Sequence, residues 1–220
     1  MARHEALGVR TVTRRTVVKV CGLTRREDAS WALACGADWL GFVVHGESPR
    51  LIEPERAGAI VDSVGGGLAV AVMVGVTPDQ ALSLAQRAHA VRVQLHRVSP
   101  ASWPADFPLP CSFAMGVTSS GELVGEEPAA RHLLLLDTAA AGLAGGTGRV
   151  FDWPVARPLA ARREVMVAGG LSGDNVAEAI RTLLPYGVDA SSSLELSPGL
   201  KDPERVRRFV EAVRHTALQP

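Results

Sequence analysis

A cysteine and an aspartate each stand at the end of a largely hydrophobic run. Cys21 follows residues 17–20, and Asp137 follows the four leucines at 133–136. If these runs are parallel strands, their carboxyl ends meet at one edge, so the thiol and the carboxyl group can face a common cavity. A thiolate can remove a proton and a carboxylic acid can donate one, which indicates general acid–base chemistry.

That chemistry makes opposite demands on the two groups. An ordinary thiol, with a pKa of about 8.5, is mostly protonated at pH 7 and needs nearby positive charges or dipoles to ionise. An ordinary aspartate, with a pKa of about 3.9, is ionised at pH 7 and needs burial to keep a proton. A buried cysteine is more often a small hydrophobic residue, which is our interpretation of Cys35 and Cys111. Asp137 alone could equally well cap a helix.

Three loops rich in glycine or serine follow the sixth, seventh and eighth hydrophobic runs. Backbone N–H groups in such loops approach anions closely, and the loops after strands seven and eight commonly hold phosphate in barrels. One Gly-Gly pair would more often be a simple turn, whereas three such loops at consecutive strand ends predict a phosphate site. Its predicted residues are Gly145, Gly146, Thr147, Gly148, Gly169, Gly170, Ser191, Ser192 and Ser193.

Eight hydrophobic runs of strand length must position these residues. They begin near residues 16, 39, 68, 91, 111, 132, 164 and 187. Amphipathic patterns between them predict helices over residues 26–35, 54–63, 78–88, 173–184 and 203–215. The many prolines between residues 98 and 131 weaken the helix signal, so helices around the fifth strand are expected to be short or missing.

The runs barely alternate between apolar and polar residues, as expected for parallel strands buried on both faces. Eight β/α units in 220 residues favour a compact, single-domain (β/α)8 TIM barrel, an α/β fold. The main alternative is an open doubly wound sheet, but Cys21-Gly22-Leu23-Thr24 stands where that fold's glycine fingerprint would follow the first strand. We expect the barrel to span residues 16–220, after a disordered lead-in over residues 1–15.

Composition excludes several classes of partner. The 23 basic and 23 acidic residues cancel, so the long-range attraction that draws basic proteins to nucleic acids or anionic membranes is missing. The three cysteines lie far apart without metal-ligand spacing, which favours a reducing cytoplasm and predicts no metal site. The hydrophobic run at 17–20 is too short for a signal peptide. We expect a small-molecule substrate and a monomer or homodimer.

A set of short motifs occurs in a characteristic order between residues 17 and 209. They are Lys19-Val20-Cys21-Gly22-Leu23-Thr24 with Asp28, Gly41-Phe42-Val43, Ser48-Pro49-Arg50, Gln94-Leu95-His96, Leu135-Leu136-Asp137, Gly145-Gly146-Thr147-Gly148, Phe151-Asp152-Trp153, Ala168-Gly169-Gly170-Leu171 with Asn175, Gly187-Val188-Asp189, and Ser191-Ser192. Together they resemble the phosphoribosylanthranilate isomerase family of tryptophan biosynthesis. The resemblance is weakest between residues 98 and 131.

The resemblance implies a cofactor-free Amadori rearrangement of N-(5′-phosphoribosyl)anthranilate by general acid–base catalysis. It implies that Asp137 protonates the furanose ring oxygen and that Cys21 removes the C2′ proton. It also implies that Arg50 holds the anthranilate carboxylate, although from its sequence context alone Arg50 could be a solvated surface residue. Gln94 and His96 are predicted to line the substrate site, without an assigned role in the chemistry.

Three residues depart from the family's usual pattern. Ser193 and Arg97 stand where glycine is usual, and Gly75 stands where asparagine is usual. We expect Ser193 to disturb a phosphate loop that requires positive φ, and we expect Ser193→Gly to tighten substrate binding. The departures leave open a relative serving a specialised pathway, or a non-catalytic barrel that binds phosphosugars. The related aldose isomerase of histidine biosynthesis uses an aspartate pair, so Cys21 argues against it.

Overall fold

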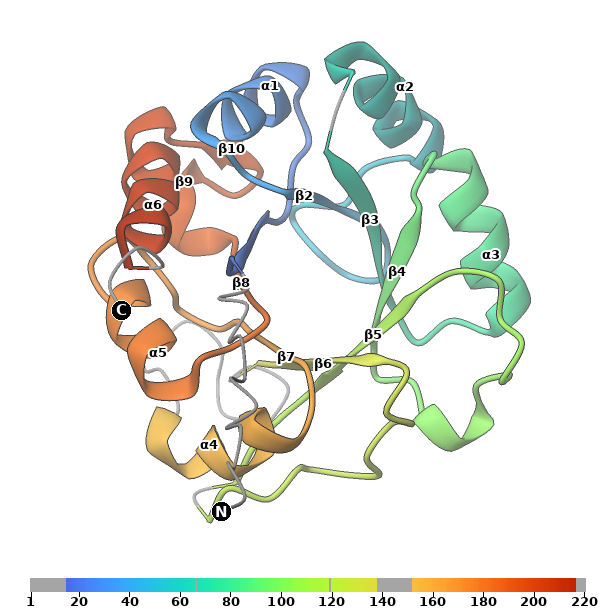
Figure 1. Ribbon diagram of the computed structural model, residues 1–220. Helices are drawn as coiled ribbons and strands as arrows, with labels where there is room; N and C mark the ends of the chain where they lie inside the picture. The colour runs from blue at the N-terminus through green and yellow to red at the C-terminus, as the bar shows by residue number, and fades with distance from the viewer. Residues whose placement is uncertain (1–14, 66, 119, 138–151, 217–220) are drawn as a thin grey trace, which may run out of the picture.

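Eight parallel strands close into a barrel in chain order, with β1 paired to β8 (Figure 1). The computed structural model describes residues 15–65, 67–118, 120–137 and 152–216. The predicted (β/α)8 barrel is therefore confirmed over the open sheet, and each strand begins within one residue of its predicted start. The strands are β1 (Val17–Val20), β2 (Trp39–His45), β3 (Leu68–Val74), β4 (Arg92–His96), β5 (Cys111–Met115), β6 (Leu133–Leu136), β7 (Val165–Val167) and β8 (Gly187–Ala190).

Helices surround the barrel on its outer face (Figure 1). They are α1 (Arg26–Cys35), α2 (Pro54–Val64), α3 (Pro78–Arg87), α4 (Trp153–Arg162), α5 (Val176–Leu183) and α6 (Pro203–Thr216). Proline opens α2, α3 and α6, where its fixed φ suits the first helical turn and its missing N–H costs no hydrogen bond. The five predicted helices are thus present, with shifts of up to three residues at their ends.

The helix α4 was not predicted, because Pro154 and Pro158 obscure its pattern. Pro154 occupies the first turn, but Pro158 lies inside the helix, where proline normally breaks the hydrogen-bond ladder. Between β4 and β5 the chain forms only the 3-10 turn η1 (Pro100–Ser102). The described residues between β5 and β6 contain no helix, so the expectation of short or missing helices there is confirmed.

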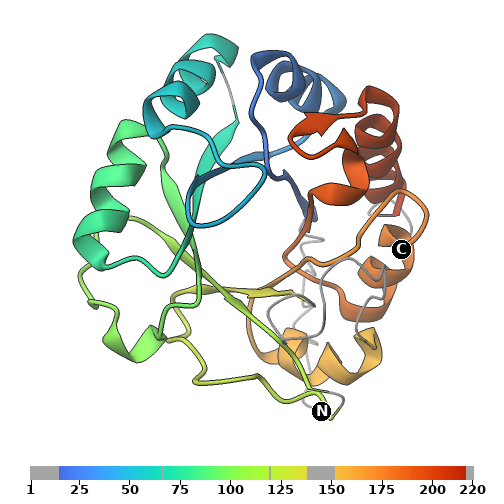
Figure 2. The ribbon, with the colours of Figure 1, turned by 180° about the vertical axis from the view of Figure 1, so that it is seen from behind.

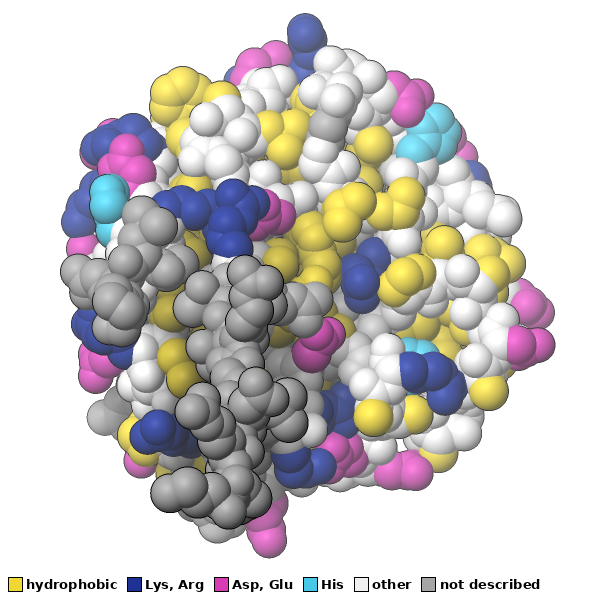
Figure 3. All heavy atoms as spheres, in the orientation of Figure 1, with side chains coloured by type: hydrophobic (Ala, Val, Ile, Leu, Met, Phe, Trp, Pro, Cys, Tyr) yellow, Lys and Arg dark blue, Asp and Glu magenta, His cyan; other side chains and the backbone are white. Residues whose placement is uncertain are grey.

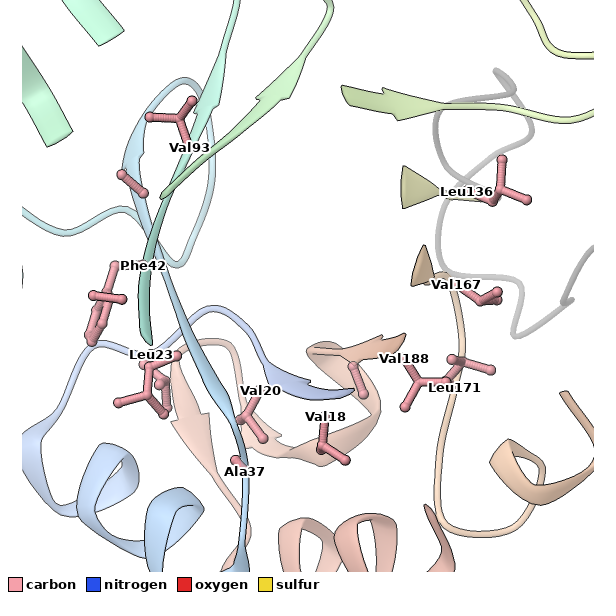
Figure 4. Close-up of a cluster of buried hydrophobic side chains, with 14 of the residues drawn as sticks. Val18, Val20, Leu23, Ala37, Phe42, Val93, Leu136, Val167, Leu171 and Val188 are labelled. Carbon is pink, nitrogen blue, oxygen red and sulfur yellow. The ribbon is translucent and has the colours of Figure 1, made fainter. Parts of the chain in front are cut away.

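Two hydrophobic clusters hold the barrel together. The larger lies between strands and helices, where Val18, Val20 and Val188 point outward (Figure 4). The smaller fills the barrel interior with side chains such as Val72, Leu135 and Met166, and also contains Cys21. Each fully buried aliphatic side chain contributes roughly 1.5–3 kcal/mol. Because side chains alternate along β1, the outward valines place Lys19 and Cys21 inside the barrel.

Aromatic and basic side chains close the amino end of the barrel. The Arg92 guanidinium lies 4.6 Å from the centroid of the Trp39 ring, and the Trp39 and Tyr186 ring centroids are 5.9 Å apart.

On the face shown in Figure 3, basic and acidic side chains of the described residues are interspersed. Among the described residues no helix is both long and apolar enough to cross a membrane.

Two of the three departures from the family pattern lie in left-handed backbone. Gly75 has a φ of +64°, in the region that glycine and asparagine adopt most readily, which accounts for the exchange of one for the other. Arg97 has a φ of +54°, where a side chain with a Cβ is strained. Arg97 thus retains a backbone conformation that suits glycine.

Replacing Arg97 with glycine is expected to raise the free energy of unfolding by about 1 kcal/mol, because glycine removes the Cβ strain of the left-handed conformation. Urea denaturation measures the change. The matched control is Arg157→Gly, at an exposed site in the middle of α4, which should lower stability by about 1 kcal/mol. Equal losses at both positions would show that residue 97 carries no strain.

Candidate active site

The predicted site residues that the structure describes all line one cavity of about 510 Å³ at the carboxyl ends of the strands. Figure 2 looks onto this end of the barrel, where the loop between β2 and α2 lies in front. The cavity is lined by Cys21, Arg50, Gln94, His96, Asp137, Gly169, Gly170, Ser191, Ser192 and Ser193, among others. Gly145, Gly146, Thr147 and Gly148 lie outside the described residues.

The Cys21 thiol packs beside a buried ion pair. Lys19 is fully buried, and its Nζ lies 2.6 Å from Asp189 Oδ2 on the neighbouring strand β8. Gly41 makes room for this group: a Cβ there would lie 2.8 Å from Cys21 Sγ and 3.0 Å from Lys19 Nζ. The arrangement places an ammonium group against the thiol and a carboxylate behind the ammonium.

The thiol and the ammonium affect each other's ionisation. Burial raises the pKa of the Cys21 thiol, and the Lys19 ammonium opposes that rise by stabilising the thiolate. Burial disfavours the charged form of Lys19, but the Asp189 carboxylate and the Cys21 side chain outweigh it and raise the pKa of Lys19. The Asp189 carboxylate therefore favours the charged form of Lys19 beside the thiol.

Lys19 and Asp189 were not among the predicted site residues, although the sequence carried a signal for them. Each is a lone charged residue within a run that reads as a strand buried on both faces. A charge buried in that way needs a partner of opposite sign. Two such charges of opposite sign, in β1 and β8, indicate an ion pair once the barrel is known to close between those strands.

Arg50 is half-buried and belongs to a second charged group at the cavity wall. Its Nε and Nη2 donate to the two carboxylate oxygens of Glu195, at 2.8 and 2.7 Å. Lys201 Nζ donates to the same carboxylate at 2.8 Å. Two cations around one anion leave a net positive charge beside the cavity. Arg50 is thus not a solvated surface residue, and Glu195 and Lys201 are further residues that the sequence analysis missed.

Glycines shape the loop after β7. Gly169 and Gly170 have φ angles of +85° and +71°, which residues with a Cβ rarely adopt. Asn175 secures the loop: its Oδ1 accepts from the Ser172 N–H at 2.9 Å, and its Nδ2 donates to the Gly170 carbonyl at 3.0 Å. The loop therefore presents backbone at the cavity wall rather than side chains.

Ser193 lies in a 3-10 turn, η3 (Ser192–Leu194), in the loop after β8. The described non-glycine residues with positive φ are His89, Arg97 and Leu184, so the expectation that residue 193 needs positive φ is wrong. A 3-10 turn has negative φ angles that serine adopts readily. The Ser193 hydroxyl instead donates a hydrogen bond to the Leu171 carbonyl, which ties the loop after β8 to the loop after β7.

We therefore expect Ser193→Gly to weaken the binding of inorganic phosphate, by about fivefold for the loss of one hydrogen bond of about 1 kcal/mol. Isothermal titration of both proteins with phosphate measures the change. Ser193→Ala, which keeps a Cβ but lacks the hydroxyl, should show a similar loss. Tighter phosphate binding by the glycine variant would show instead that Ser193 strains the loop after β8.

Gln94 and His96 form the wall opposite the glycine and serine loops. The Gln94 side-chain amide lies 3.0 Å from His96 Nε2. Burial lowers the pKa of His96 to about 4, although the Asp137 carboxylate favours its protonation. His96 is therefore neutral at pH 7, so it is an uncharged neighbour of Asp137. The Asp137 backbone N–H donates to the Met115 carbonyl at 3.0 Å, which anchors the end of β6.

A second cavity, of about 840 Å³, adjoins the first and shares His96 and Asp137 with it. Its wall includes apolar side chains such as Val74, Met115 and Val124.

Within the described residues, no three histidine, cysteine, aspartate or glutamate side chains gather as a metal site would require. The arrangement offers a thiol, a carboxyl group and a backbone-lined cradle around a space of substrate size.

A closed barrel with a thiol and a carboxyl group at the carboxyl ends of its strands has the architecture of a (β/α)8-barrel enzyme. The model of the family described as N-(5′-phosphoribosyl)anthranilate (PRA) isomerase matches residues 18–212. The chain belongs to that family.

Individual relatives agree with this assignment. An N-(5′-phosphoribosyl)anthranilate isomerase from Rubrobacter xylanophilus is 43% identical over 209 residues, covering 90% of this chain and 98% of the relative. The crystal structure of phosphoribosyl anthranilate isomerase from Thermotoga maritima matches with a TM-score of 0.78 and 31% identity, covering 91% and 99% of the two chains. A structure of such an isomerase in complex with reduced 1-(o-carboxyphenylamino)-1-deoxyribulose 5-phosphate matches with a TM-score of 0.75 and 29% identity, over the same shares.

Proposed function

We propose that this protein catalyses the Amadori rearrangement of N-(5′-phosphoribosyl)anthranilate to 1-(2-carboxyphenylamino)-1-deoxyribulose 5-phosphate in tryptophan biosynthesis. The observation that carries the proposal is the presence of Cys21 and Asp137 in one cavity with the loops after β7 and β8. Family membership and the solved complex with a reduced product support the same reaction.

In the proposed mechanism, Asp137 donates a proton to the furanose ring oxygen, which opens the ring to an iminium ion. Cys21 then removes the proton from C2′ as a thiolate, giving an enolamine that tautomerises to the ketone. The Lys19 ammonium supports this step because it stabilises the thiolate. Each proton transfer contributes typically 10²–10⁴ to the rate.

The substrate's two anionic ends need different partners. We propose that backbone N–H groups of Gly169, Gly170 and residues 191–193 hold the phosphate, together with the loop 145–148. We propose that Arg50 binds the anthranilate carboxylate, since the net positive charge of Arg50, Glu195 and Lys201 favours an anion there. The adjoining cavity beyond His96 has the size and the apolar wall to take the aromatic ring.

We propose a cytoplasmic location and a single catalytic domain over residues 16–220, acting as a monomer or homodimer without a cofactor, with residues 1–15 as a lead-in. The free cysteines Cys21, Cys35 and Cys111 support a reducing compartment.

The decisive experiment mixes the purified protein with freshly generated N-(5′-phosphoribosyl)anthranilate and follows the loss of anthranilate-type fluorescence. Rapid loss that depends on enzyme concentration is the expected result. Binding of inorganic phosphate without turnover would instead show a non-catalytic phosphosugar-binding barrel and would overturn the proposal.

A further inference from the structure

One carboxylate oxygen in the cavity wall is buried without a hydrogen-bond partner. Within the part of the chain that the structure describes, four buried side-chain atoms share this condition: Trp103 Nε1, Trp153 Nε1, Arg163 Nε and Asp189 Oδ1. Of these four residues, Asp189 alone lines the cavity with Cys21 and Asp137. A buried acceptor without a partner is costly, more so when it is charged, so a ligand that donates a hydrogen bond there gains affinity.

The free oxygen is held in a fixed position. Asp189 Oδ2 is bound by Lys19 Nζ at 2.6 Å, and Lys19 is itself fully buried, so the carboxylate cannot turn to satisfy Oδ1 elsewhere without losing its ion pair. An acceptor oriented in advance binds a donor without the entropic cost of ordering a mobile side chain.

The register of β1 and β8 places this oxygen relative to the catalytic thiol. Asp189 pairs with Lys19, and the Cys21 N–H donates to the Ala190 carbonyl, so Cys21 lies level with the start of the loop after β8. Asp189 lines the same cavity one layer deeper than Cys21 and Ser191, so it lies at the cavity floor. A phosphopentose that spans from the loop after β8 to Cys21 passes over this floor.

We propose that Asp189 Oδ1 accepts a hydrogen bond from the 3′-hydroxyl of the substrate's ribose. This inference rests on the proposed function, because it assumes that the phosphate lies at the loops after β7 and β8 and that C2′ faces Cys21. In a phosphopentose held in that way, C3′ lies between the phosphate-bearing end and C2′. Asp189 is then a substrate-binding residue that selects sugars with a hydroxyl group at this carbon.

The test pairs a change in the protein with a change in the ligand. The unreactive reduced product, 1-(o-carboxyphenylamino)-1-deoxyribitol 5-phosphate, and its 3-deoxy counterpart are titrated against the wild-type protein and Asp189→Ala. Loss of a hydrogen bond to a charged group typically weakens binding by about 10- to 100-fold, so the wild type should prefer the complete ligand by that factor. The Ala variant should prefer it by less than about threefold, because the acceptor is absent.

An equal preference in both proteins, or none in the wild type, would overturn the proposal. Inorganic phosphate should bind both proteins alike, which shows that the variant is folded and its phosphate loops are intact. If Asp189→Ala does not fold, the double variant Lys19→Met with Asp189→Val removes the acceptor without leaving a buried lone charge. Because these titrations need no turnover, absence of turnover by the wild type would overturn the proposed function while the ligand preference still tests Asp189.

Discussion

Replacing Asp137 with asparagine, or Cys21 with serine, is expected to lower kcat by about 100- to 10,000-fold. Asparagine has nearly the shape of aspartate but cannot donate the proton that opens the sugar ring. A serine hydroxyl is a far weaker acid than a thiol, so it is not available as an oxyanion base near neutral pH. Steady-state measurement of the fluorescence loss gives kcat for each variant and for the wild type.

Binding measurements separate this catalytic effect from a structural one. Both variants should bind inorganic phosphate as the wild type does, because the loops after β7 and β8 are unchanged. Two matched controls should keep wild-type turnover: Cys35→Ser, in α1 on the outside of the barrel, and Asp79→Asn, at an exposed position in α3. Nearly unaltered kcat in either active-site variant would remove the corresponding proton transfer from the mechanism.

The strands and the site's location could be predicted because both follow from local sequence. A strand buried on both faces needs a continuous apolar run, as the leucines at 133–136 show, and the residue after each run then lies at the catalytic end of the barrel. Cys21 and Asp137 satisfy that rule. The helix α4 escaped prediction because Pro158 contradicts helix formation locally, while packing of Trp153, Ala156 and Leu159 against the core stabilises the helix in the folded chain.

The charged partners in the site depend on the closure of the barrel, and local patterns do not report that closure. Lys19 and Asp189 are 170 residues apart, and Arg50 and Glu195 are 145 residues apart. Each pair forms only because the last strand and the loop after it return to the first two units. Ser193 was misread for a related reason: a loop's backbone conformation follows from its hydrogen bonds across to a neighbouring loop, here to the Leu171 carbonyl.

Replacing Lys19 with methionine is expected to lower the free energy of unfolding by about 3–5 kcal/mol, the range for breaking a buried ion pair on one side. Methionine fills most of the lysine's volume, so the loss reports the Asp189 carboxylate left buried without its partner. Urea denaturation measures the change. The control is the double variant Lys19→Met with Asp189→Val, which removes both charges and should recover most of the stability. Equal stability of the single variant and the wild type would contradict the buried pair.

The same substitution should also shift the pH dependence of catalysis. Burial raises the pKa of Cys21, so the thiolate fraction, and with it kcat/KM, should increase with pH through the alkaline range in the wild type. The Lys19 ammonium opposes the rise in the thiol pKa, so its removal should raise that pKa further. The part of the profile in which kcat/KM increases with pH should then move to higher pH. If a folded Lys19→Met variant had the same pH dependence of kcat/KM as the wild type, Lys19 would serve stability alone. A shift that the double variant shares would assign the effect to the ammonium group itself.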